Sequence, residues 1–223
     1  MNDSVIRSID PCETSINELL RLEEASWPQR LRASESTIRE RFRLGHEVVG
    51  AVVNGSLVAA AGFVHTSQAP TDRLTFPTDH RTYSSLPAST PVCSTFVYNL
   101  CVVPGQRGRG AVRQILRAVE SEARARRARF LVGDARCPAY AGGRIQSRRR
   151  VERDAVFREA LDNWHASGVH PTDHVLMRDP VLRLYYRYLQ CEFLFPVSGF
   201  LPEDTASGGF SVICVKRLNG QVR

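Results

Sequence analysis

The sequence predicts a mixed α/β protein, because strand and helix signals alternate along the chain. Two β-rich runs, residues 46–53 and 56–64, are joined by Asn54-Gly55, which is the strongest short-range signal for a hairpin. Residues 94–103 form an almost unbroken apolar and β-branched run, as expected for a central strand covered on both faces. A basic turn with glycines then leads into apolar residues at helical spacing.

The chain before the hairpin is predicted to add a strand and two helices. Residues 5–10 have the composition of a short strand. Ser15 and Glu18 have the spacing of a capping box, which predicts a first helix that begins at Ser15. Ser34 is placed to cap a second helix, which ends near Gly45.

The elements after the hairpin are predicted from breaks, caps and periodicity. They are, in order, a long loop at residues 66–93, the central strand, a helix from Arg109, a strand at 129–136, a loop opened by Pro138 and Gly142-Gly143, a helix at 151–166, a helix from Asp179-Pro180 through Tyr188, and strands at 191–197 and 209–217. Four prolines break the long loop, which is expected to decorate one domain rather than to link two.

Composition excludes several classes of protein. The chain has 223 residues, of which 43% are hydrophobic and 24% charged, as in an ordinary globular protein and unlike a disordered or fibrous one. No apolar run approaches the roughly 18 residues that cross a bilayer, and the N-terminus lacks the features of a signal peptide. A cytoplasmic protein without a membrane partner is therefore expected. Six cysteines without any Cys-x-x-Cys pair favour buried thiols over a zinc or redox motif.

The charge of the chain points to an anionic ligand or an acidic partner. Its net charge is +7 and its pI is near 9.4. Nearly all the basic residues are arginines, which bind phosphate and carboxylate through paired hydrogen bonds. No nucleic-acid-binding signature accompanies the charge, so nucleic acid is not expected as a partner. His170 and His174 have the spacing of a helical metal pair, but Pro171 lies between them, and no metal site is predicted.

The basic turn, residues 104–112, lies where the central strand ends and a helix begins. Free N–H groups at a helix start favour a bound pyrophosphate, and Gly108 and Gly110 let the backbone approach it closely. Arg107 and Arg109 add positive charge. The turn is neither a Walker loop nor a Rossmann fingerprint, because it lacks Gly-Lys-Ser/Thr and the third glycine. It therefore predicts a nucleoside phosphate of another kind.

Arg107-x-x-Gly110-x-Val112 resembles motif A of the GCN5-related N-acetyltransferase (GNAT) superfamily, Arg/Gln-x-x-Gly-x-Gly/Ala, with Val112 in place of the last small residue. The order of the predicted elements resembles that superfamily over nearly the entire chain. The resemblance implies a GNAT fold, with a mixed central sheet of about seven strands flanked by helices and splayed at the central strand. It also implies a single domain at residues 1–223, with insertions at 66–93 and 141–177, and acetyl-CoA or another acyl-CoA as co-substrate.

Three later segments resemble a narrower group, the GNAT-like loading domains of polyketide synthases and the GNAT halves fused to carbon-nitrogen hydrolases. They are residues 135–140 (Ala-Arg-Cys-Pro-Ala-Tyr), 179–185 (Asp-Pro-Val-Leu-Arg-Leu-Tyr) and 199–204 (Gly-Phe-Leu-Pro-Glu-Asp). In the loading decarboxylases a Thr precedes the Arg-Cys and a His ends the Asp-Pro segment. Here those positions hold Ala135 and Tyr185, or Tyr186 if the helix is aligned from its far end. The resemblance thus implies a relationship without the decarboxylation chemistry.

The GNAT resemblance also implies roles for particular residues. Backbone groups of the central strand would bind pantetheine and the acyl oxygen, at Leu100, Cys101, Val102 and Val103. The turn would bind the pyrophosphate through Arg107, Gly108, Arg109, Gly110, Ala111 and Val112. A tyrosine of the late helix would protonate the leaving thiolate, with Tyr186 ranked before Tyr185. The candidates for a base are Glu47, Asp134 and His65, and those for the substrate pocket are Trp27, Asn99 and Arg136.

One functional hypothesis and two alternatives follow. The first is an acyl-CoA-dependent N-acyltransferase that acts on a small-molecule amine in specialised metabolism. In this hypothesis neither Cys137 nor Cys101 is expected to carry the acyl group as a thiolate, because no histidine pairs with either. The second is a loading enzyme that moves an acyl group, with or without decarboxylation, from CoA to the phosphopantetheine thiol of an acidic acyl carrier protein. The third is a catalytically degenerate CoA-binding domain. A homodimer is an open alternative to a monomer.

Overall fold

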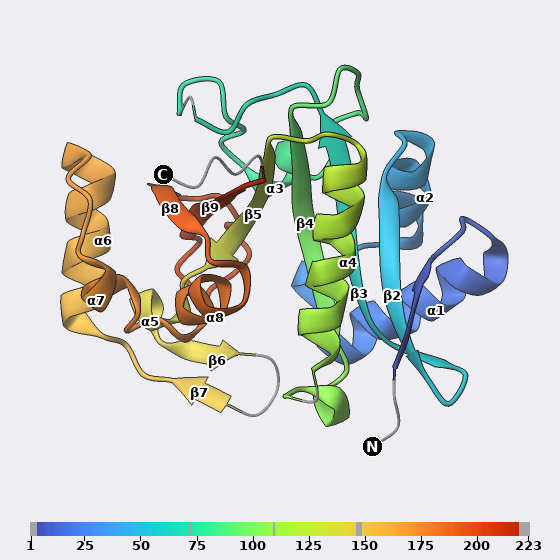
Figure 1. Ribbon diagram of the computed structural model, residues 1–223. Helices are drawn as coiled ribbons and strands as arrows, with labels where there is room; N and C mark the ends of the chain where they lie inside the picture. The colour runs from blue at the N-terminus through green and yellow to red at the C-terminus, as the bar shows by residue number, and fades with distance from the viewer. Residues whose placement is uncertain (1–3, 72, 109, 146–148, 219–223) are drawn as a thin grey trace. The chain divides into compact units, whose positions relative to one another are not determined.

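The computed structural model describes residues 4–71, 73–108, 110–145 and 149–218 (Figure 1). Their strands form a seven-stranded sheet of order β1-β2-β3-β4-β5-β9-β8 and a separate pair, β6-β7. This sheet with its flanking helices confirms the predicted fold class. The chain divides into two compact units, unit 1 with Met1–Ala69, Ser84–Leu131 and Leu218–Arg223, and unit 2 with Pro70–Tyr83 and Val132–Arg217. A single domain and a splay at the central strand stay predictions.

Unit 1 contains an antiparallel run of four strands covered by helices. The strands are β1 (Val5–Ser8), β2 (Glu47–Val53), β3 (Ser56–Thr66) and β4 (Ser94–Val102). The helices are α1 (Glu13–Ser26), η1 (Gln29–Leu31), α2 (Glu35–Arg43), η2 (Pro104–Gln106) and α4 (Ala111–Ala125). In Figure 1, α4 lies in front of these strands and α1 runs behind them. Each face of the four strands is therefore covered.

The core of unit 1 follows from the strand register. Ala60 of β3 lies opposite Cys101 of β4, so the two side chains share one face of the sheet. Both belong to an apolar cluster that includes Ile16, Leu19 and Leu22 of α1. The apolar face of α1 is thereby buried against β3 and β4.

Unit 2 is built from the following elements. They are α3 (His80–Tyr83), most of β5 (Phe130–Arg136), α5 (Pro138–Ala141), β6 (Gly143–Ile145), β7 (Arg149–Val151), α6 (Ala155–Ser167), α7 (Asp173–Leu176), α8 (Pro180–Leu189), β8 (Glu192–Val197) and β9 (Ser211–Arg217). Aromatic residues form part of its core: the Tyr83 ring lies 5.7 Å from Phe76 and 5.7 Å from Phe200, measured between centroids. The segment before α3 is thus held by packing, although its sequence predicts only a loop.

The predicted caps and turns are mostly confirmed. Asn54 and Gly55 have φ of 50° and 78°, as a two-residue type I′ hairpin requires. Ser34 accepts a hydrogen bond from the Thr37 N–H at the start of α2. Asp179 accepts hydrogen bonds from the first amides of α8. Local signals therefore fix three of the element boundaries.

Two predicted helix starts are wrong. The first helix begins at Glu13 with Cys12 as its N-cap, so Ser15 lies buried inside the helix and forms no capping box. The helix predicted to begin at residue 151 begins at Ala155, because the Asp154 carboxylate accepts a hydrogen bond from the Phe157 N–H and fixes the start there. Residue 151 is the last residue of β7 instead.

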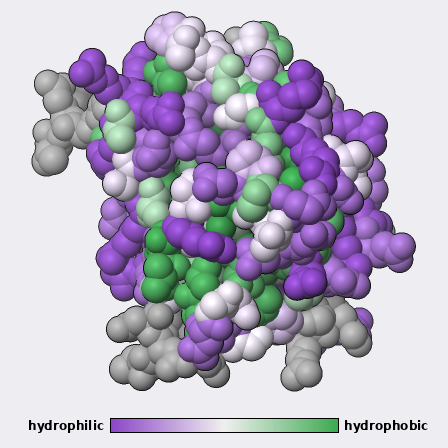
Figure 2. Space-filling view, turned by 90° about the vertical axis from the view of Figure 1, so that its right-hand side faces the viewer, coloured by the Kyte–Doolittle hydropathy of each residue, from purple (hydrophilic) through white to green (hydrophobic). Residues whose placement is uncertain are grey.

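The face seen in Figure 2 is hydrophilic over much of its area, with a hydrophobic patch in its lower half. Exposed ion pairs lie around α1 and α2, between Arg7 and Glu18, Arg39 and Glu13, and Arg43 and Glu40. Exposed pairs of this kind add little stability, so they describe a solvated face. None of the helices in the described part of the chain combines the length and the apolar character needed to cross a bilayer.

Candidate functional site

The turn after β4 adopts a conformation that only glycine accepts readily. Gly108 and Gly110 have φ of 76° and 89°. A Cβ built at Gly105, Gly108 or Gly110 would have no described atom within 4 Å. The glycines are therefore not required by packing within the described protein, and the backbone of the turn is accessible.

Within the part of the chain that the structure describes, the start of α4 presents backbone amides without a partner beside this turn. Gly110 is the N-cap, and the first helical hydrogen bond runs from the Gln114 N–H to the Gly110 carbonyl at 3.1 Å. The amides of Ala111 and Val112 precede that bond, at the positive end of the helix dipole. Burial lowers the pKa of Arg107 in the same turn. Arg109 lies outside the described residues.

The four residues for which sequence analysis predicts pantetheine binding, Leu100 to Val103, direct their backbone N–H groups to two different sides of β4. The Val103 N–H donates to the Val58 carbonyl at 2.9 Å, so this amide is bonded within the protein. N–H groups alternate between the two sides of a strand, and the Cys101 amide therefore also points toward β3. The amides of Leu100 and Val102 point to the other side of β4.

A buried carboxylate from α1 lies against the central strand. Glu23 is 5% exposed. Its Oε1 accepts hydrogen bonds from Asn99 Nδ2 and, at 3.2 Å, from Cys101 Sγ, and its Oε2 accepts one from the Ala33 N–H at 3.0 Å. Trp27 Nε1–H donates to Cys101 Sγ at 2.9 Å. Of the predicted substrate residues, Asn99 thus contacts this acid directly and Trp27 is linked to it through Cys101. The sequence analysis did not single out Glu23.

The buried thiols of Cys101 and Cys137 do not ionise readily. Burial raises the pKa of the Cys101 thiol well above its ordinary value, and the nearby Glu23 carboxylate raises it further. Burial also raises the pKa of the Cys137 thiol well above its ordinary value. Since only the thiolate is a good nucleophile, an acyl-cysteine route is not supported.

A small cavity adjoins Glu23 in unit 1. Its volume is about 30 Å³, which is room for about two water molecules. It is lined by residues from α1, α2, β2, β3 and β4 and by His46, which precedes β2: Leu19, Leu22, Glu23, Ile38, Arg41, Phe42, His46, Val48, Ala60, Gly62, Tyr98, Asn99 and Cys101. The space admits the end of a small ligand and not a whole substrate.

The polar side chains that line this cavity include hydrogen-bond acceptors, on Glu23 and His46, and a hydrogen-bond donor, on Arg41. His46 Nε2 donates to the Leu86 carbonyl at 2.8 Å, and burial lowers the pKa of His46 to about 4, so the ring is neutral at pH 7. Burial raises the pKa of Tyr98 to about 12, and the Arg41 guanidinium lies 4.5 Å from the centre of its ring. Within the described residues, His46 Nδ1 and Arg41 Nε are buried without a hydrogen-bond partner.

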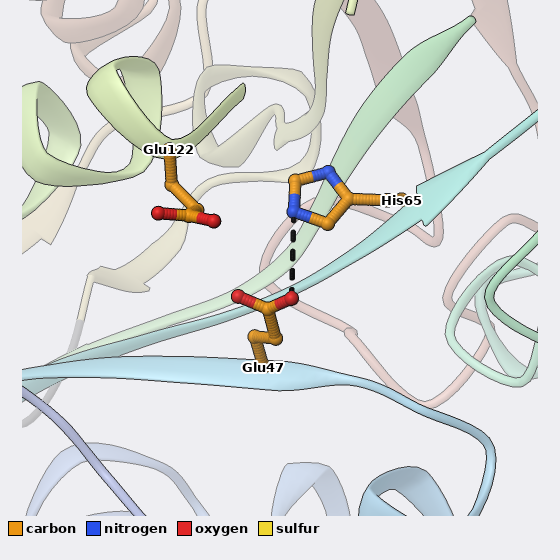
Figure 3. Close-up of side chains that lie close together, drawn as sticks. All are labelled: Glu47, His65 and Glu122. Carbon is orange, nitrogen blue, oxygen red and sulfur yellow. Dashed lines mark ion pairs between the residues drawn. The ribbon is translucent and has the colours of Figure 1, made fainter. Parts of the chain in front are cut away.

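Glu47 and His65 lie in a second cluster of unit 1, with Glu122 of α4 (Figure 3). His65 Nε2 is 3.6 Å from Glu47 Oε1, and Arg126 binds Glu47 and Glu122 at 3.0 Å each. Burial raises the pKa of Glu47, whereas burial lowers the pKa of His65 to about 4. Glu122 lies near the C-terminal end of α4, about 18 Å along the helix from Gly110 at the rise of 1.5 Å per residue.

In unit 2, Tyr185 and Asp134 lie together and Tyr186 lies apart. The Tyr185 hydroxyl donates to the Asp134 carbonyl at 3.2 Å, and burial raises the pKa of both side chains. A Cβ at Gly133 would be 3.0 Å from the Tyr185 ring, so this glycine permits the close approach. Tyr186 is 44% exposed and its ring stacks on Phe193, with centroids 6.4 Å apart.

Several solved structures share the fold of this chain. The GphF GNAT-like decarboxylase in complex with isobutyryl-CoA is 22% identical, with a TM-score of 0.70 over 96% of this chain and 100% of that chain. The loading GNATL domain of CurA from Lyngbya majuscula is 15% identical, with a TM-score of 0.70 over 96% and 98% of the two chains. This chain has the GNAT fold. The aminoglycoside 6'-N-acetyltransferase from Enterococcus faecium shares it at 13% identity and a TM-score of 0.61, over 98% and 99% of the chains. No protein-family model and no curated protein matches the sequence.

The three segments that resemble GNAT-like loading domains form a buried network in unit 2. Arg136 Nη2 donates to Asp204 Oδ1 at 2.5 Å, and the two side chains are 11% and 1% exposed. Asp179 Oδ2 accepts a hydrogen bond from the Ala139 N–H at 2.9 Å while its other oxygen caps α8. Arg136, a candidate for the substrate pocket, is thus engaged by a buried acid of the protein itself. The Asp134 carbonyl group is bonded to the nitrogen of Ala135 and accepts the Tyr185 hydroxyl hydrogen bond; these are two of the positions, with Tyr186 as the alternative to Tyr185, that the resemblance to the loading decarboxylases singles out.

Glu23 is the residue of this candidate site that sequence reasoning missed. It lies four residues after Leu19 and seven after Ile16, which places it on the apolar stripe of α1. The one signal for Glu23 in the sequence is therefore a charged residue among the apolar residues that α1 buries. Its partners Asn99 and Cys101 lie more than 70 residues further along the chain, so the cluster itself has no local signature.

Proposed function

We propose that the protein is an acyl-CoA-dependent acyltransferase that transfers the acyl group to a small-molecule amine. The observation that carries this proposal is the turn between β4 and α4, where Gly108 and Gly110 hold left-handed conformations and a Cβ built on either would have no described atom outside the adjoining residues within 4 Å. Such a turn, followed by helix-start amides that have no partner among the described residues, suits a pyrophosphate. The likeness to solved structures named as acetyltransferases supports the same reaction class.

The acyl-CoA would be bound mainly by the backbone. The amides of Ala111 and Val112 would bind the pyrophosphate, with Arg107 as a cation in the same turn. The amides of Leu100 and Val102 are the ones on β4 that point away from β3, so they are the ones assigned to pantetheine and to the acyl oxygen. The Val103 amide is not assigned, because Val58 accepts its hydrogen bond.

The amine would enter the cavity beside Glu23. A carboxylate in a poorly solvated cavity binds an ammonium group strongly and can take its proton. The neutral amine then attacks the thioester carbonyl, the C–N bond forms, and the C–S bond breaks. Arg41 Nε is a donor for a hydroxyl or carboxylate group of the acceptor. Glu47 is not assigned as base, because Arg126 pairs with it near the opposite end of α4.

The leaving thiolate must then gain a proton, and Tyr185 is the better candidate on α8. Its hydroxyl is held by the Asp134 carbonyl, whereas the Tyr186 ring is exposed to solvent. A phenol in a fixed position can donate to a stronger base that forms beside it. Asp134 has a raised pKa and stays a second candidate for the base.

The experiment combines CoA binding with thiol release. Calorimetry with CoA is expected to show one saturable site, and a thiol-reactive dye is expected to report release that depends on both acetyl-CoA and an amine from a panel with and without carboxylates. Absence of CoA binding would overturn the proposal. Tight CoA binding with no thiol release from any acyl donor would replace it with a degenerate CoA-binding domain.

A second candidate function, loading of an acyl carrier protein, is favoured by a basic depression in unit 2. Its volume is about 400 Å³, and it is lined by Arg150, Val151, Glu152, Arg178, Pro180, Arg183 and Arg187. Arg178 is paired with Asp154 at 2.7 Å, which leaves three arginines against one glutamate, and this lining would attract an acidic partner. The likeness to the loading GNATL domain of CurA supports the same reading.

Intact-mass analysis separates the two functions. A holo carrier protein is incubated with the protein and either acetyl-CoA or malonyl-CoA. A mass gain that falls in a variant with both Arg183 and Arg187 changed to Gln would establish loading, and no mass gain would eliminate it. With Ala135 and Tyr185 in place of Thr and His, any malonyl group transferred is expected to keep its carboxylate.

A further inference from the structure

His65 has a ring nitrogen whose surroundings do not satisfy it. The residue is 4% exposed, and its Nδ1 lies 2.8 Å from Thr95 Oγ1. Within the described part of the chain, its Nε2 is buried without a hydrogen-bond partner. If Nε2 carried the proton, it would point at Glu47 Oε1 from 3.6 Å, which is too long for a hydrogen bond. The geometry therefore favours Nδ1–H donating to Thr95, with the Nε2 lone pair toward the carboxylate.

Two carboxylates share this space with the lone pair. One ligand atom each from Glu47, His65 and Glu122 lie within 4.8 Å of one another. Figure 3 shows the three side chains converging from β2, β3 and α4. A ring lone pair and two carboxylates are all acceptors, so their convergence is unfavourable without a cation between them.

The cation already present is Arg126, and it is placed to move. Arg126 binds both carboxylates at 3.0 Å, but its side chain is 52% exposed, and exposed ion pairs are weak. One guanidinium against two carboxylates leaves a formal charge of −1, and the guanidinium does not reach the hydrogen-bonding distance of His65 Nε2 in the described structure. A small dication would interact with all three groups.

We propose that Glu47, His65 and Glu122 form a binding site for a divalent transition-metal ion, with Zn²⁺ as the best match. One imidazole nitrogen and two carboxylate oxygens are ligands that Zn²⁺ accepts at about 2.0–2.2 Å, with water in the fourth position. Tetrahedral ligands at that distance lie about 3.4 Å apart, so the side chains need to close by about an ångström. Thr95 acts as the outer partner that fixes the ring, as is common for metal-bound histidines.

The site would tie α4 to the sheet at the end remote from Gly110. Its ligands come from the C-terminal part of α4 and from two strands that α4 covers. It would therefore act on stability and on the placement of α4 rather than on the reacting atoms. This inference is independent of the acyltransferase proposal, since none of its ligands has a role there.

The test measures metal binding directly. Protein treated with a chelator and dialysed is titrated with Zn²⁺ against a chromophoric competitor, and with Co²⁺ while visible absorption is recorded. One ion per chain is expected, with an intense four-coordinate Co²⁺ spectrum. Glu122→Gln removes a direct ligand, so it is expected to weaken Zn²⁺ binding by at least the roughly 10–100-fold that loss of an outer partner costs, and to abolish that spectrum.

Two further variants make the result specific. Glu120→Gln is the matched control. Glu120 lies on the same helix and pairs with Arg124, four residues later, just as Glu122 pairs with Arg126. It is expected to bind Zn²⁺ like the unchanged protein. Arg126→Gln removes the competing cation and is expected to bind several-fold more tightly. No saturable binding, or binding that Glu122→Gln leaves unchanged, would overturn the proposal, as would weaker binding in Arg126→Gln.

Discussion

Glu23 of α1 and Asn99 of β4 lie 76 residues apart in the chain, and the Asn99 side-chain amide donates to the Glu23 carboxylate. The other carboxylate oxygen accepts the Ala33 N–H, so both oxygens are held. The helix thereby delivers a buried acid to the central strand, at the wall of a cavity. A GNAT fold whose sequence shows no obvious base on its central strand thus acquires an acid from a neighbouring helix.

Replacing this acid tests its part in the reaction. Glu23→Gln keeps the shape but removes the charge, and kcat for the amine is expected to fall by about 100-fold, the usual effect of losing a general base. Glu24→Gln is the matched control, because the side chain of Glu24 is 73% exposed on the same helix. Steady-state kinetics with circular dichroism on both variants gives the answer. Equal kcat values for the two variants would remove Glu23 from the mechanism.

The glycine turn is tested by a pair of variants that strain the backbone equally. Gly110→Ala and Gly55→Ala both place a Cβ at a positive φ, 89° and 78°, with no described atom within 4 Å. Each is expected to lose about 1–2 kcal/mol of folding free energy. Only Gly110→Ala is expected to weaken CoA binding, by at least tenfold in calorimetry. A similar loss of CoA affinity in Gly55→Ala would show that the effect is general destabilisation.

Elements with local signals could be predicted, and clusters formed by tertiary contacts could not. Asn54-Gly55, Ser34 and Asp179 act on residues two to four positions away, and the sequence identifies all of them. Ser15 misleads because Cys12 begins α1 one turn earlier and leaves Ser15 inside the helix.

The site residues show the same limit more sharply. Successive residues of a helix point about 100° apart, so choosing between Tyr185 and Tyr186 requires knowing which face of α8 is covered. The cluster of Glu47, His65 and Glu122 depends on strand register and on how α4 crosses the sheet. Each of the three residue types is ordinary in its own segment, and no spacing in the sequence connects them.

The tyrosines of α8 provide a matched pair for the proton donor. Tyr185→Phe removes the hydroxyl that the Asp134 carbonyl holds, and kcat is expected to fall by at least tenfold while KM for acyl-CoA changes little. Tyr186→Phe removes a hydroxyl from an exposed ring and is expected to leave kcat unchanged. The alkaline limb of the kcat profile should change only in the first variant. The opposite order of effects would restore Tyr186 as the donor.

The raised pKa of the buried Tyr98 hydroxyl predicts that the folded protein loses stability at high pH. Burial raises its pKa from the ordinary 10 to about 12 in the folded protein. Between those values the unfolded chain has released the proton and the folded chain keeps it, so stability falls as the pH rises. By pH 11 this loss amounts to about 1.4 kcal/mol. Urea unfolding of the unchanged protein and of Tyr98→Phe at pH 8 and pH 11 should show it as a smaller loss in the variant. Parallel losses in both would exclude a raised pKa.

The buried pair of Arg136 and Asp204 tests whether this segment of unit 2 is structural. Arg136→Met leaves the Asp204 carboxylate, 1% exposed, without its cation, and breaking a buried pair in this way costs about 3–5 kcal/mol. Arg217→Met is the control, because Arg217 and Glu192 are more than half exposed and such pairs contribute about 0–1 kcal/mol. Urea unfolding is expected to show the large loss only for Arg136→Met. If Arg136→Met unfolds at the same urea concentration as Arg217→Met but loses activity, Arg136 binds the substrate, and its ion pair with Asp204 breaks when the substrate binds.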